Sequence, residues 1–432
     1  MRYWGLMATL KSEARQPNCA AEAQSNAAPA QLLVMESGRG KGGSSTFLYS
    51  VLCHLDADQF RARVGFYFRN DASDTELIRS RVPVLFFATQ QIGSFLYRFV
   101  ERDLTSRLLQ HAQALLRLPV IELPICWRIY RYLKAEAVDL MLLNNDVHGH
   151  VAATLAARLA GIPCLCRKTG NYGEGRRVKK WLAPMVDVFI AISAATERDV
   201  YQYCPGARKV LRIYEGVDVT RFQPNGDNRE LRAELGIPPG TKVVCSIGRF
   251  KKGRGQEELL TAAPEILKAY ENVVFLLVGD ESPAKGAYSR ALEMQVEQAR
   301  LKDKVIFTGW RSDIPAILAM TDVFVHCPST VTEGLGIANL EAMASGKPVV
   351  VSDNGGLLDA VTDGVTGFVV PIGDTQTLAE RVVELLRDGS LAARFGAAAR
   401  KRIEADFDVA RNTRKLEEAM QACLLEHAAA VK

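Results

Sequence analysis

Short apolar runs alternate repeatedly with longer segments of helical periodicity along this chain. The first unit reads QLLVME at 31–36, then the glycine-rich SGRGKGG, then SSTFLYSVLCHL. A series of this kind predicts an α/β protein with a parallel sheet and helices on both faces. Further strands are expected at 61–68, 83–87, 139–143, 163–167, 187–192 and 209–213.

A polar, proline-rich stretch at 218–240 interrupts the alternation, and a second series follows it. Its strands are expected at 242–248, 273–278, 305–307, 322–325, 348–352 and 367–370. The 432 residues exceed what one core accommodates, which favours two domains. We expect two Rossmann-like, doubly wound domains that face each other across a cleft, with ligands at the carboxyl ends of the strands. The expected segments are a disordered leader at 1–30, an N-terminal domain at 31–217, a linker at 218–240, a C-terminal domain at 241–408 and a closing helix at 409–432.

Charge and cysteine content exclude several classes of protein. The net charge of +5, from 54 basic and 49 acidic residues, is too small for a dedicated nucleic-acid binder. The nine cysteines have no paired zinc-like spacing, and several lie inside apolar runs, which fits a reducing cytosol. No run approaches the roughly 18 apolar residues that span a bilayer. We therefore expect a cytoplasmic protein that is soluble or peripheral to the membrane.

Residues 92–132 interleave aromatic and basic side chains, such as Phe95, Arg98, Trp127 and Arg131. One interpretation is a face that rests on anionic lipid. The other is a set of amphipathic helices with a buried aromatic stripe, which we favour.

The segment 327–350, CPSTVTEGLGIANLEAMASGKPVV, concentrates the candidate binding residues. Gly334 and Gly336 precede an expected helix, so a diphosphate could approach backbone N–H groups at its positive end. Glu333 in the loop and Glu341 inside the helix offer carboxylates that accept hydrogen bonds from sugar hydroxyls. The alternative is a loop acid at a helix N-terminus and a solvated helix residue.

A second candidate follows the strand at 242–248, where Gly248 and Arg249 lead into Lys251, Lys252, Gly253, Arg254 and Gly255. Basic side chains at the carboxyl end of a strand can neutralise the charge on a departing diphosphate. An ordinary basic surface loop is the competing interpretation.

Taken together, these segments resemble glycosyltransferase family 4. The resemblance covers about 31–425 and is carried by six motifs in the family's order: Gly248-Arg249 through Arg254-Gly255, then Phe275-Leu276-Leu277-Val278-Gly279-Asp280, Val305-Ile306-Phe307-Thr308-Gly309, Glu333-Gly334-Leu335-Gly336, Glu341-Ala342-Met343-Ala344-Ser345-Gly346-Lys347-Pro348-Val349-Val350 and Asp363-Gly364-Val365-Thr366-Gly367-Phe368-Val369-Val370.

The resemblance implies a retaining transferase of the GT-B fold that uses a nucleoside-diphosphate sugar and no catalytic metal. It implies that Arg249 and Arg254 hold the diphosphate, that Glu341 contacts the ribose, and that Glu333 contacts the sugar near its anomeric centre. Gly248, Gly279, Gly334, Leu335 and Gly336 would complete the donor site. The acceptor would be a saccharide or a lipid-linked saccharide. The resemblance also points to a role in surface polysaccharide or lipopolysaccharide assembly, the usual setting of the family.

Two positions depart from the family pattern. Arg254 stands where a lysine is usual, so a planar fork replaces a point charge. Thr169 stands at the expected position of an N-terminal-domain histidine, so the acceptor-side catalytic residue is open. His148, in the loop after the preceding strand, is a second candidate for that role, and His150 lies beside it. A surface or capping role is the alternative for both histidines.

Gly38-Arg39-Gly40-Lys41-Gly42-Gly43 satisfies the dinucleotide pattern GxGxxG, but the acidic residue expected about 20 residues later is missing. The resemblance to the family implies instead that Gly42 and Gly43 belong to an acceptor-side loop. A nicotinamide-dependent oxidoreductase and a non-catalytic nucleotide-sugar-binding protein stay as alternatives. Asp56-Ala57-Asp58 and Asp406-Phe407-Asp408 follow no strand in the expected cleft, and no metal is expected.

Overall fold

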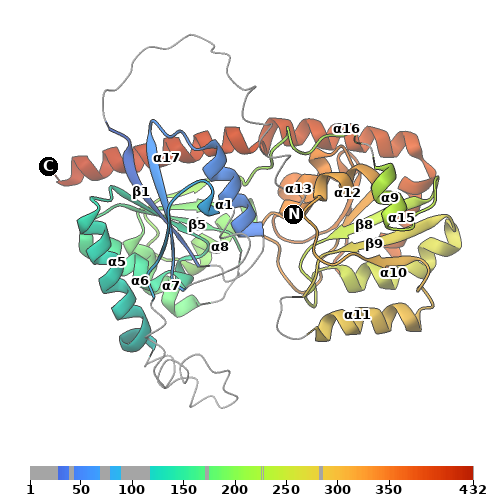
Figure 1. Cartoon of the computed structure of the whole chain (residues 1–432), viewed down its shortest axis with the longest axis horizontal. Coiled ribbons are helices and arrows are strands. Elements are labelled where there is room, and N and C mark those ends of the chain that lie inside the picture. Colours follow the sequence, from blue (N-terminus) through green and yellow to red (C-terminus); the bar gives the residue numbers. More distant parts are fainter. Residues whose placement is uncertain are drawn as a thin grey trace, which may run out of the picture.

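Two parallel sheets organise the chain, seen side by side in Figure 1. The structure is a computed structural model that describes residues 28–37, 43–68, 78–88, 117–170, 175–224, 226, 228–281 and 286–431. Along most of the sequence, helices alternate with the strands of each sheet, as the pattern predicts.

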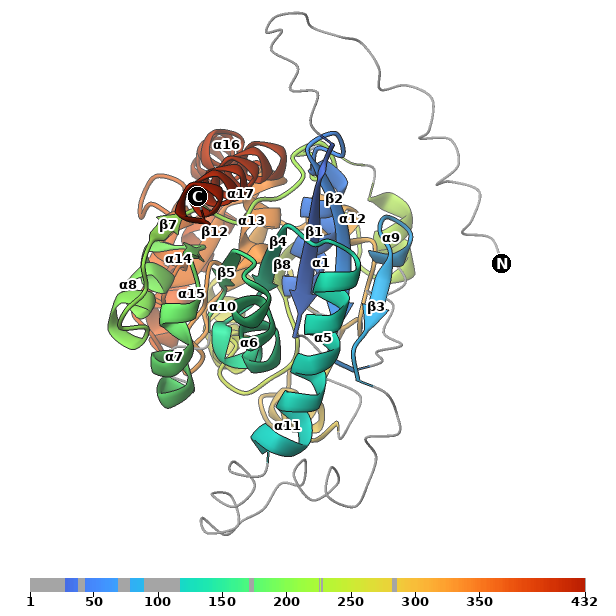
Figure 2. The ribbon, with the colours of Figure 1, turned by 90° about the vertical axis from the view of Figure 1, so that its left-hand side faces the viewer.

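The N-terminal sheet has seven strands among the described residues, in the order β3-β2-β1-β4-β5-β6-β7, and all the pairings are parallel. The strands are β1 Ala30–Glu36, β2 Phe60–Phe66, β3 Val84–Phe86, β4 Leu140–Asn144, β5 Cys164–Lys168, β6 Val188–Ala191 and β7 Val210–Arg212. The helices are α1 Gly43–His54, α5 Leu123–Ala135, α6 Val151–Ala160, α7 Arg176–Leu182 and α8 Ala194–Tyr203. Figure 2 shows α5, α6 and α7 on one side of this sheet.

The C-terminal sheet has six strands among the described residues, in the order β10-β9-β8-β11-β12-β13, again with parallel pairings. The strands are β8 Lys242–Ile247, β9 Val273–Val278, β10 Val305–Phe307, β11 Val323–His326, β12 Val349–Ser352 and β13 Gly367–Val370. The helices are α9 Arg229–Glu234, α10 Gln256–Ala269, α11 Ala287–Gln298, α12 Ile314–Met320, α13 Ile337–Ala344, α14 Leu357–Ala360, α15 Thr375–Arg387 and α16 Gly389–Asp406. The final helix, α17 Val409–Val431, follows them in the sequence.

Apolar side chains cover both faces of each sheet. Because parallel strands are buried on both faces, they read as nearly continuous apolar runs. This explains why the expected strands match the observed ones to within two residues. The segment expected as a linker contains α9, and its Leu231 packs with Phe222 and Ile237 into the C-terminal core.

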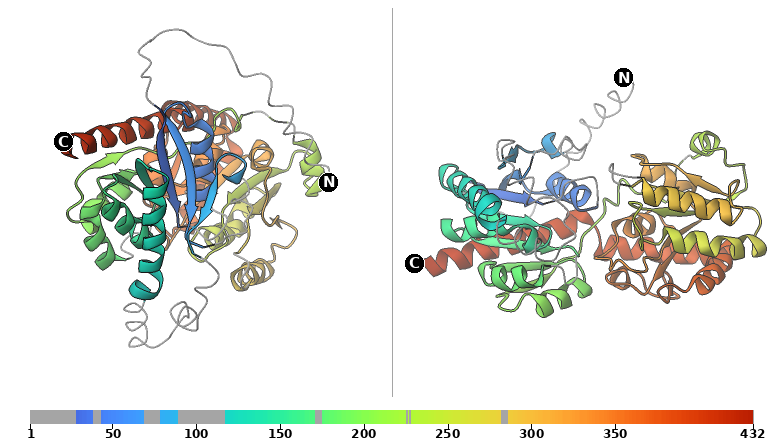
Figure 3. Two further views of the ribbon diagram at one scale, coloured as in Figure 1. Left: turned by 60° about the vertical axis from the view of Figure 1, so that its left-hand side comes forward. Right: turned by 90° about the horizontal axis from the view of Figure 1, so that it is seen from below.

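The final helix returns to the N-terminal domain. Leu416, Met420 and Cys423 of α17 lie in the same buried cluster as Phe47 and Leu48 of α1. In Figures 1 and 3, α17 runs from the junction of the two domains along the N-terminal one. The chain therefore passes between the domains twice.

The two passages lie side by side. Val217 donates its backbone N–H to the carbonyl of Phe407 at 2.9 Å, and Val409 donates to the carbonyl of Val217 at 3.1 Å. Next to them, a Cβ on Gly216 would lie 2.6 Å from Cα of Val409, so only glycine allows this approach. No helix in the described part of the chain is long and apolar enough to cross a bilayer.

Candidate functional site

Both sheets have a topological switch point, where successive connections leave in opposite directions and a crevice opens at the carboxyl ends of the strands. In the N-terminal sheet it lies between β1 and β4, and in the C-terminal sheet between β8 and β11. The predicted donor residues follow β8 and β11, so the structure brings them to one edge of the C-terminal sheet.

The loop between β8 and α10 carries the basic candidates. Arg249 is exposed, and Arg254 is partly buried. Gln256 donates from Nε2 to the carbonyl of Arg249 at 3.3 Å, which ties the loop to the first turn of α10. Lys251 and Lys252 are exposed, so this edge of the domain carries a concentration of positive charge.

Close packing against the loop after β11 explains the glycines. A Cβ on Gly253 would lie 1.8 Å from Oγ1 of Thr330, and one on Gly255 would lie 2.9 Å from the backbone of Cys327. Gly279, at the end of β9 with a φ of 132°, would place a Cβ 2.1 Å from the carbonyl oxygen of Gly248. These three positions require glycine for both space and backbone conformation.

Glu333 lies in the loop after β11 and faces two nitrogen-bearing side chains. Oε2 of Glu333 accepts a hydrogen bond from Nη1 of Arg254 at 3.3 Å and lies 3.7 Å from Nε2 of His326. Burial lowers the pKa of His326, against the raising effect of Glu333. The lowered pKa favours the neutral form of His326, and Arg254 and Glu333 carry opposite charges.

Glu341 lies in the second turn of α13, whose N-cap is Gly336 with a φ of 81°. Burial raises the pKa of Glu341 to about 7, although Arg221 lowers it in part. The side chain of Leu335 is buried in the core, so only its backbone is available for a ligand.

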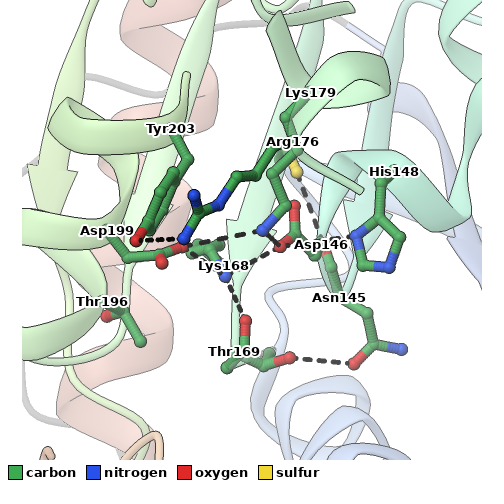
Figure 4. Close-up of polar contacts among 12 residues, drawn as sticks. Asn145, Asp146, His148, Lys168, Thr169, Arg176, Lys179, Thr196, Asp199 and Tyr203 are labelled. Atoms are coloured by element: carbon green, nitrogen blue, oxygen red, sulfur yellow. Dashed lines mark hydrogen bonds and ion pairs between the residues drawn. The ribbon is translucent and has the colours of Figure 1, made fainter. Parts of the chain in front are cut away.

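On the N-terminal side, Thr169 follows β5 directly, and its Oγ1 donates a hydrogen bond to Oδ1 of Asn145 at 3.1 Å (Figure 4). Both side chains are partly exposed. The carbonyl oxygen of Thr169 contacts Gly334 so closely that a Cβ there would lie 2.0 Å from it. The structure thereby brings the predicted acceptor-side residue against the predicted donor loop.

A buried cluster of four ions lies behind Thr169. Nζ of Lys168 lies 2.7 Å from Oδ2 of Asp146 and 2.8 Å from Oδ2 of Asp199, and Nζ of Lys179 lies 2.6 Å from Oδ2 of Asp146. All four side chains are at most 1% exposed. Burial raises the pKa of Asp146, but His148, Lys168 and Lys179 outweigh it and hold this pKa well below its usual range.

His148 and His150 have different environments. Nδ1 of His148 lies 3.5 Å from Oδ2 of Asp146, and its side chain is 23% exposed. His150 is fully buried between the hydroxyl of Tyr67 and the carbonyl of Asn144, each at 2.9 Å. Burial lowers the pKa of His150 to about 4. His150 is therefore a neutral core residue rather than a cleft residue.

Three polar residues at this edge, namely Glu36, Asn144 and Asn145, were missed by sequence reasoning. Asn144 and Asn145 donate to Glu36, and Arg167 bonds both Asn144 and Glu215. Glu36 and Asn144 each end an apolar strand, as does His326 in the C-terminal sheet. A polar residue at the carboxyl end of an apolar run is the signal that could have found them.

Some predicted positions are not part of the described site. Gly42 and the rest of 38–42 lie outside the described residues, whereas Gly43 begins α1. Asp56 accepts the backbone N–H of Asp58, and Asp408 that of Arg411, so both act locally in turns and helix starts. Among the described residues, no three His, Cys, Asp or Glu side chains gather as metal ligands.

Two doubly wound domains that meet at the carboxyl ends of their strands have the architecture of the GT-B fold. Residues 227–402 match the family described as "Glycosyl transferases group 1", and the chain belongs to this family.

Two curated relatives and one solved structure illustrate the similarity. The chain is 32% identical over 313 residues to alpha-maltose-1-phosphate synthase of Mycolicibacterium smegmatis, covering 63% of this chain and 78% of that protein. It is 31% identical over 214 residues to spore coat protein SA of Bacillus subtilis, covering 47% of this chain and 56% of that protein. The fold resembles Anabaena HepE, solved with UDP and glucose, with a TM-score of 0.75 and 23% identity over 91% of this chain and 100% of HepE.

Proposed function

We propose that this chain is a retaining transferase of glycosyltransferase family 4, which moves a sugar from a nucleoside-diphosphate sugar to a hydroxyl acceptor without a catalytic metal. The observation that carries the proposal is the position of Glu333. Arg254 donates a hydrogen bond to this carboxylate. Gly334, the residue after Glu333, contacts Thr169 of the opposite domain. An acid at the junction of the two domains would contact a sugar as it passes between them.

The basic loop supports the departure of the diphosphate. As the bond from C1 of the sugar to the diphosphate breaks, Arg249 and Arg254 would neutralise the growing negative charge. The acceptor oxygen forms its bond to C1 on the same face, and its proton passes to the departing phosphate. No covalent carboxylate intermediate is needed, and closure of the domains around a bound acceptor would reduce the access of competing water.

A thermal-shift titration tests the donor site. The protein is titrated with UDP, GDP, ADP, their sugars and NAD(P), first without metal and then with EDTA. We expect stabilisation by one diphosphate that is insensitive to EDTA and is lost in Arg249→Ala. UDP is the first nucleotide to test because HepE, which shares the fold, was solved with it.

The matched control for Arg249→Ala is Lys302→Ala. Lys302 is an exposed base that precedes β10, so it lies at the opposite edge of the same sheet. The control removes the same charge from the domain and should keep the shift. Stabilisation by NAD(P) alone would contradict the proposal, and binding without release of nucleotide from the sugar donor would identify a non-catalytic binding protein.

We also propose a setting for the reaction: polysaccharide or lipopolysaccharide assembly at the inner face of the plasma membrane. Three observations support this setting. Members of the family usually act in such pathways, the cysteines are free, which fits a reducing compartment, and the outer face of α5 exposes apolar and basic side chains. On that face Leu123 is 48% and Trp127 59% exposed, and Arg131 is exposed beside them. Co-sedimentation with vesicles of phosphatidylglycerol should exceed that with phosphatidylcholine vesicles, and Trp127→Ala should reduce it. Equal binding to both vesicles would contradict this setting.

A further inference from the structure

Asn145 has an unusual backbone for its place in the fold. Among the described residues, three non-glycine residues have a positive φ, namely Ala137, Asn145 and Arg300. Ala137 and Arg300 are exposed and lie just after α5 and α11, where a left-handed residue commonly ends a helix. Asn145, with a φ of 98°, instead follows a buried strand at the switch point. Strain of this kind persists only where surrounding contacts hold it, and it concentrates at functional sites.

Side-chain contacts from two other strand ends hold Asn145. Its Nδ2 donates to Oε1 of Glu36 at 2.6 Å and to Oγ of Ser37 at 3.3 Å, both at the end of β1. Its Oδ1 accepts from Thr169 at the end of β5. Because a carboxylate only accepts, the bond to Glu36 fixes which end of the amide is Nδ2. Oδ1 must therefore face Thr169.

That orientation determines what Thr169 can do. Its hydroxyl carries one proton, and this proton is donated to Asn145. The lone pairs of Oγ1 are then left to accept a hydrogen bond. Thr169 lies against the donor loop, so a hydroxyl that donates to Oγ1 would be held beside the sugar.

The four-ion cluster holds the same two strand ends. Asp146 follows Asn145 and Lys168 precedes Thr169, so the ion pair between them lies next to the Asn145–Thr169 hydrogen bond (Figure 4). Lys179 from α7 and Asp199 from α8 complete the cluster, as two cations and two anions. Buried ion pairs add little net stability, but they demand a defined geometry. The cluster thus provides a rigid support for the hydrogen bond between Asn145 and Thr169.

We propose that Asn145 orients Thr169 as the hydrogen-bond acceptor for the attacking hydroxyl, so that this enzyme aligns its acceptor on a neutral side chain rather than deprotonating it on the protein. The inference rests on the proposed transferase function. When the acceptor oxygen bonds to C1 and the bond from C1 to the diphosphate breaks, the hydroxyl proton leaves with the diphosphate. Thr169 touches the acceptor, and Asn145 is a positioning residue that acts through it.

The test is a double-mutant cycle on nucleotide release from UDP-glucose, GDP-mannose and ADP-glucose, with water as the attacking hydroxyl. Thr169→Val removes the lone pairs at nearly constant shape and should lower release on the order of tenfold to a hundredfold, because alignment is lost. Thr169→Ser should stay within about threefold of the wild type, because the hydroxyl is kept. Thr261→Val, on the exposed face of α10, is the matched control and should have no effect.

Asn145→Ala should lower release by itself but add nothing to Thr169→Val, because it acts through the same hydroxyl. Multiplying effects in the double variant would show that Asn145 acts elsewhere and would overturn the inference, as would an unchanged rate in Thr169→Val. Stabilisation by UDP should persist in every variant.

Stability provides a readout that needs no turnover. Asn145→Gly and Asn145→Ala lose the same side-chain bonds, but only glycine relieves a φ of 98°. Asn145→Gly should therefore melt about 1–3 °C above Asn145→Ala and be no more active. If Asn145→Gly melts no higher than Asn145→Ala, the backbone of Asn145 is not strained. Absence of both UDP binding and nucleotide release in the wild type would instead reject the transferase proposal itself.

Discussion

The carbonyl oxygen of Thr169 in the N-terminal domain contacts Gly334 in the C-terminal domain so closely that no side chain fits at position 334. Asp359 of α14 adds a polar contact between the domains, since it accepts the backbone N–H of Ala194 at 3.0 Å and the hydroxyl of Tyr214 at 3.1 Å.

Gly334→Ala should push the donor loop away from Thr169 of the opposite domain without unfolding either domain. A Cβ 2.0 Å from a carbonyl oxygen forces a backbone to move, and a displacement of about 1 Å can cost on the order of a hundredfold in rate. Nucleotide release should fall by this order, whereas the melting temperature should change little. Gly389→Ala is the matched control, because nothing lies within 4 Å of a Cβ there. Equal activity in the two variants would show that the contact does not matter.

Glu333→Gln should reduce turnover more than donor binding. The amide keeps the shape but loses the charge that pairs with Arg254. We expect kcat to fall at least about tenfold while the KM for the donor stays within about threefold, because the interaction is made with the reacting sugar. Near-normal turnover in this variant would mean that the site has been assigned to the wrong carboxylate.

His326 should tolerate glutamine better than asparagine. The amide of glutamine reaches about as far as Nε2, which lies 3.7 Å from Glu333, whereas that of asparagine stops near Nδ1. His326→Gln should keep most of the kcat, and His326→Asn should lose it, with similar melting temperatures for both. A purely structural histidine would instead show equal rates and a loss of stability in both variants.

Glu341→Gln should stabilise the protein in alkaline solution. The pKa of Glu341 is raised to about 7 by burial, so the folded state binds its proton more tightly than the unfolded state. This contribution is fully present below the unfolded pKa of about 4.3 and is lost as pH rises through 7. The variant should therefore melt above the wild type at pH 8, with the difference shrinking toward pH 5. If Glu341 also contacts the ribose, stabilisation by UDP should weaken. A pH-independent difference in melting temperature would contradict the burial of an ionisable carboxyl.

Lys168→Met should destabilise the N-terminal domain strongly. It leaves Asp146 and Asp199 with Lys179 as the remaining cation of the cluster, and an uncompensated buried charge costs about 3–5 kcal/mol. Adding Asp146→Asn should recover part of the loss, because it restores the charge balance. Lys268→Met breaks an exposed pair with Glu265 and should change the free energy of unfolding by less than about 1 kcal/mol in urea titrations. Similar losses from the two single variants would mean that water reaches the cluster.

The sheets could be predicted because most of their strands are nearly continuous apolar runs, and the donor residues could be predicted because they follow two of these runs. The partners of each residue could not. His326 contacts Glu333 across a loop, and Asn145 meets Glu36 across more than 100 residues. The closing helix was expected from its periodicity, but its packing against α1 depends on which apolar surface stays uncovered. Local pattern specifies elements, whereas burial and polar pairing arise from the assembled fold.

The paired passages at Val217 and at Phe407 to Val409 have a mechanical consequence. Two chain segments joined by backbone hydrogen bonds restrict how the domains can move relative to each other more than a single connecting segment would. Because α17 belongs to the N-terminal core, cutting the chain after residue 408 would leave an apolar face of that domain bare rather than release an independent unit.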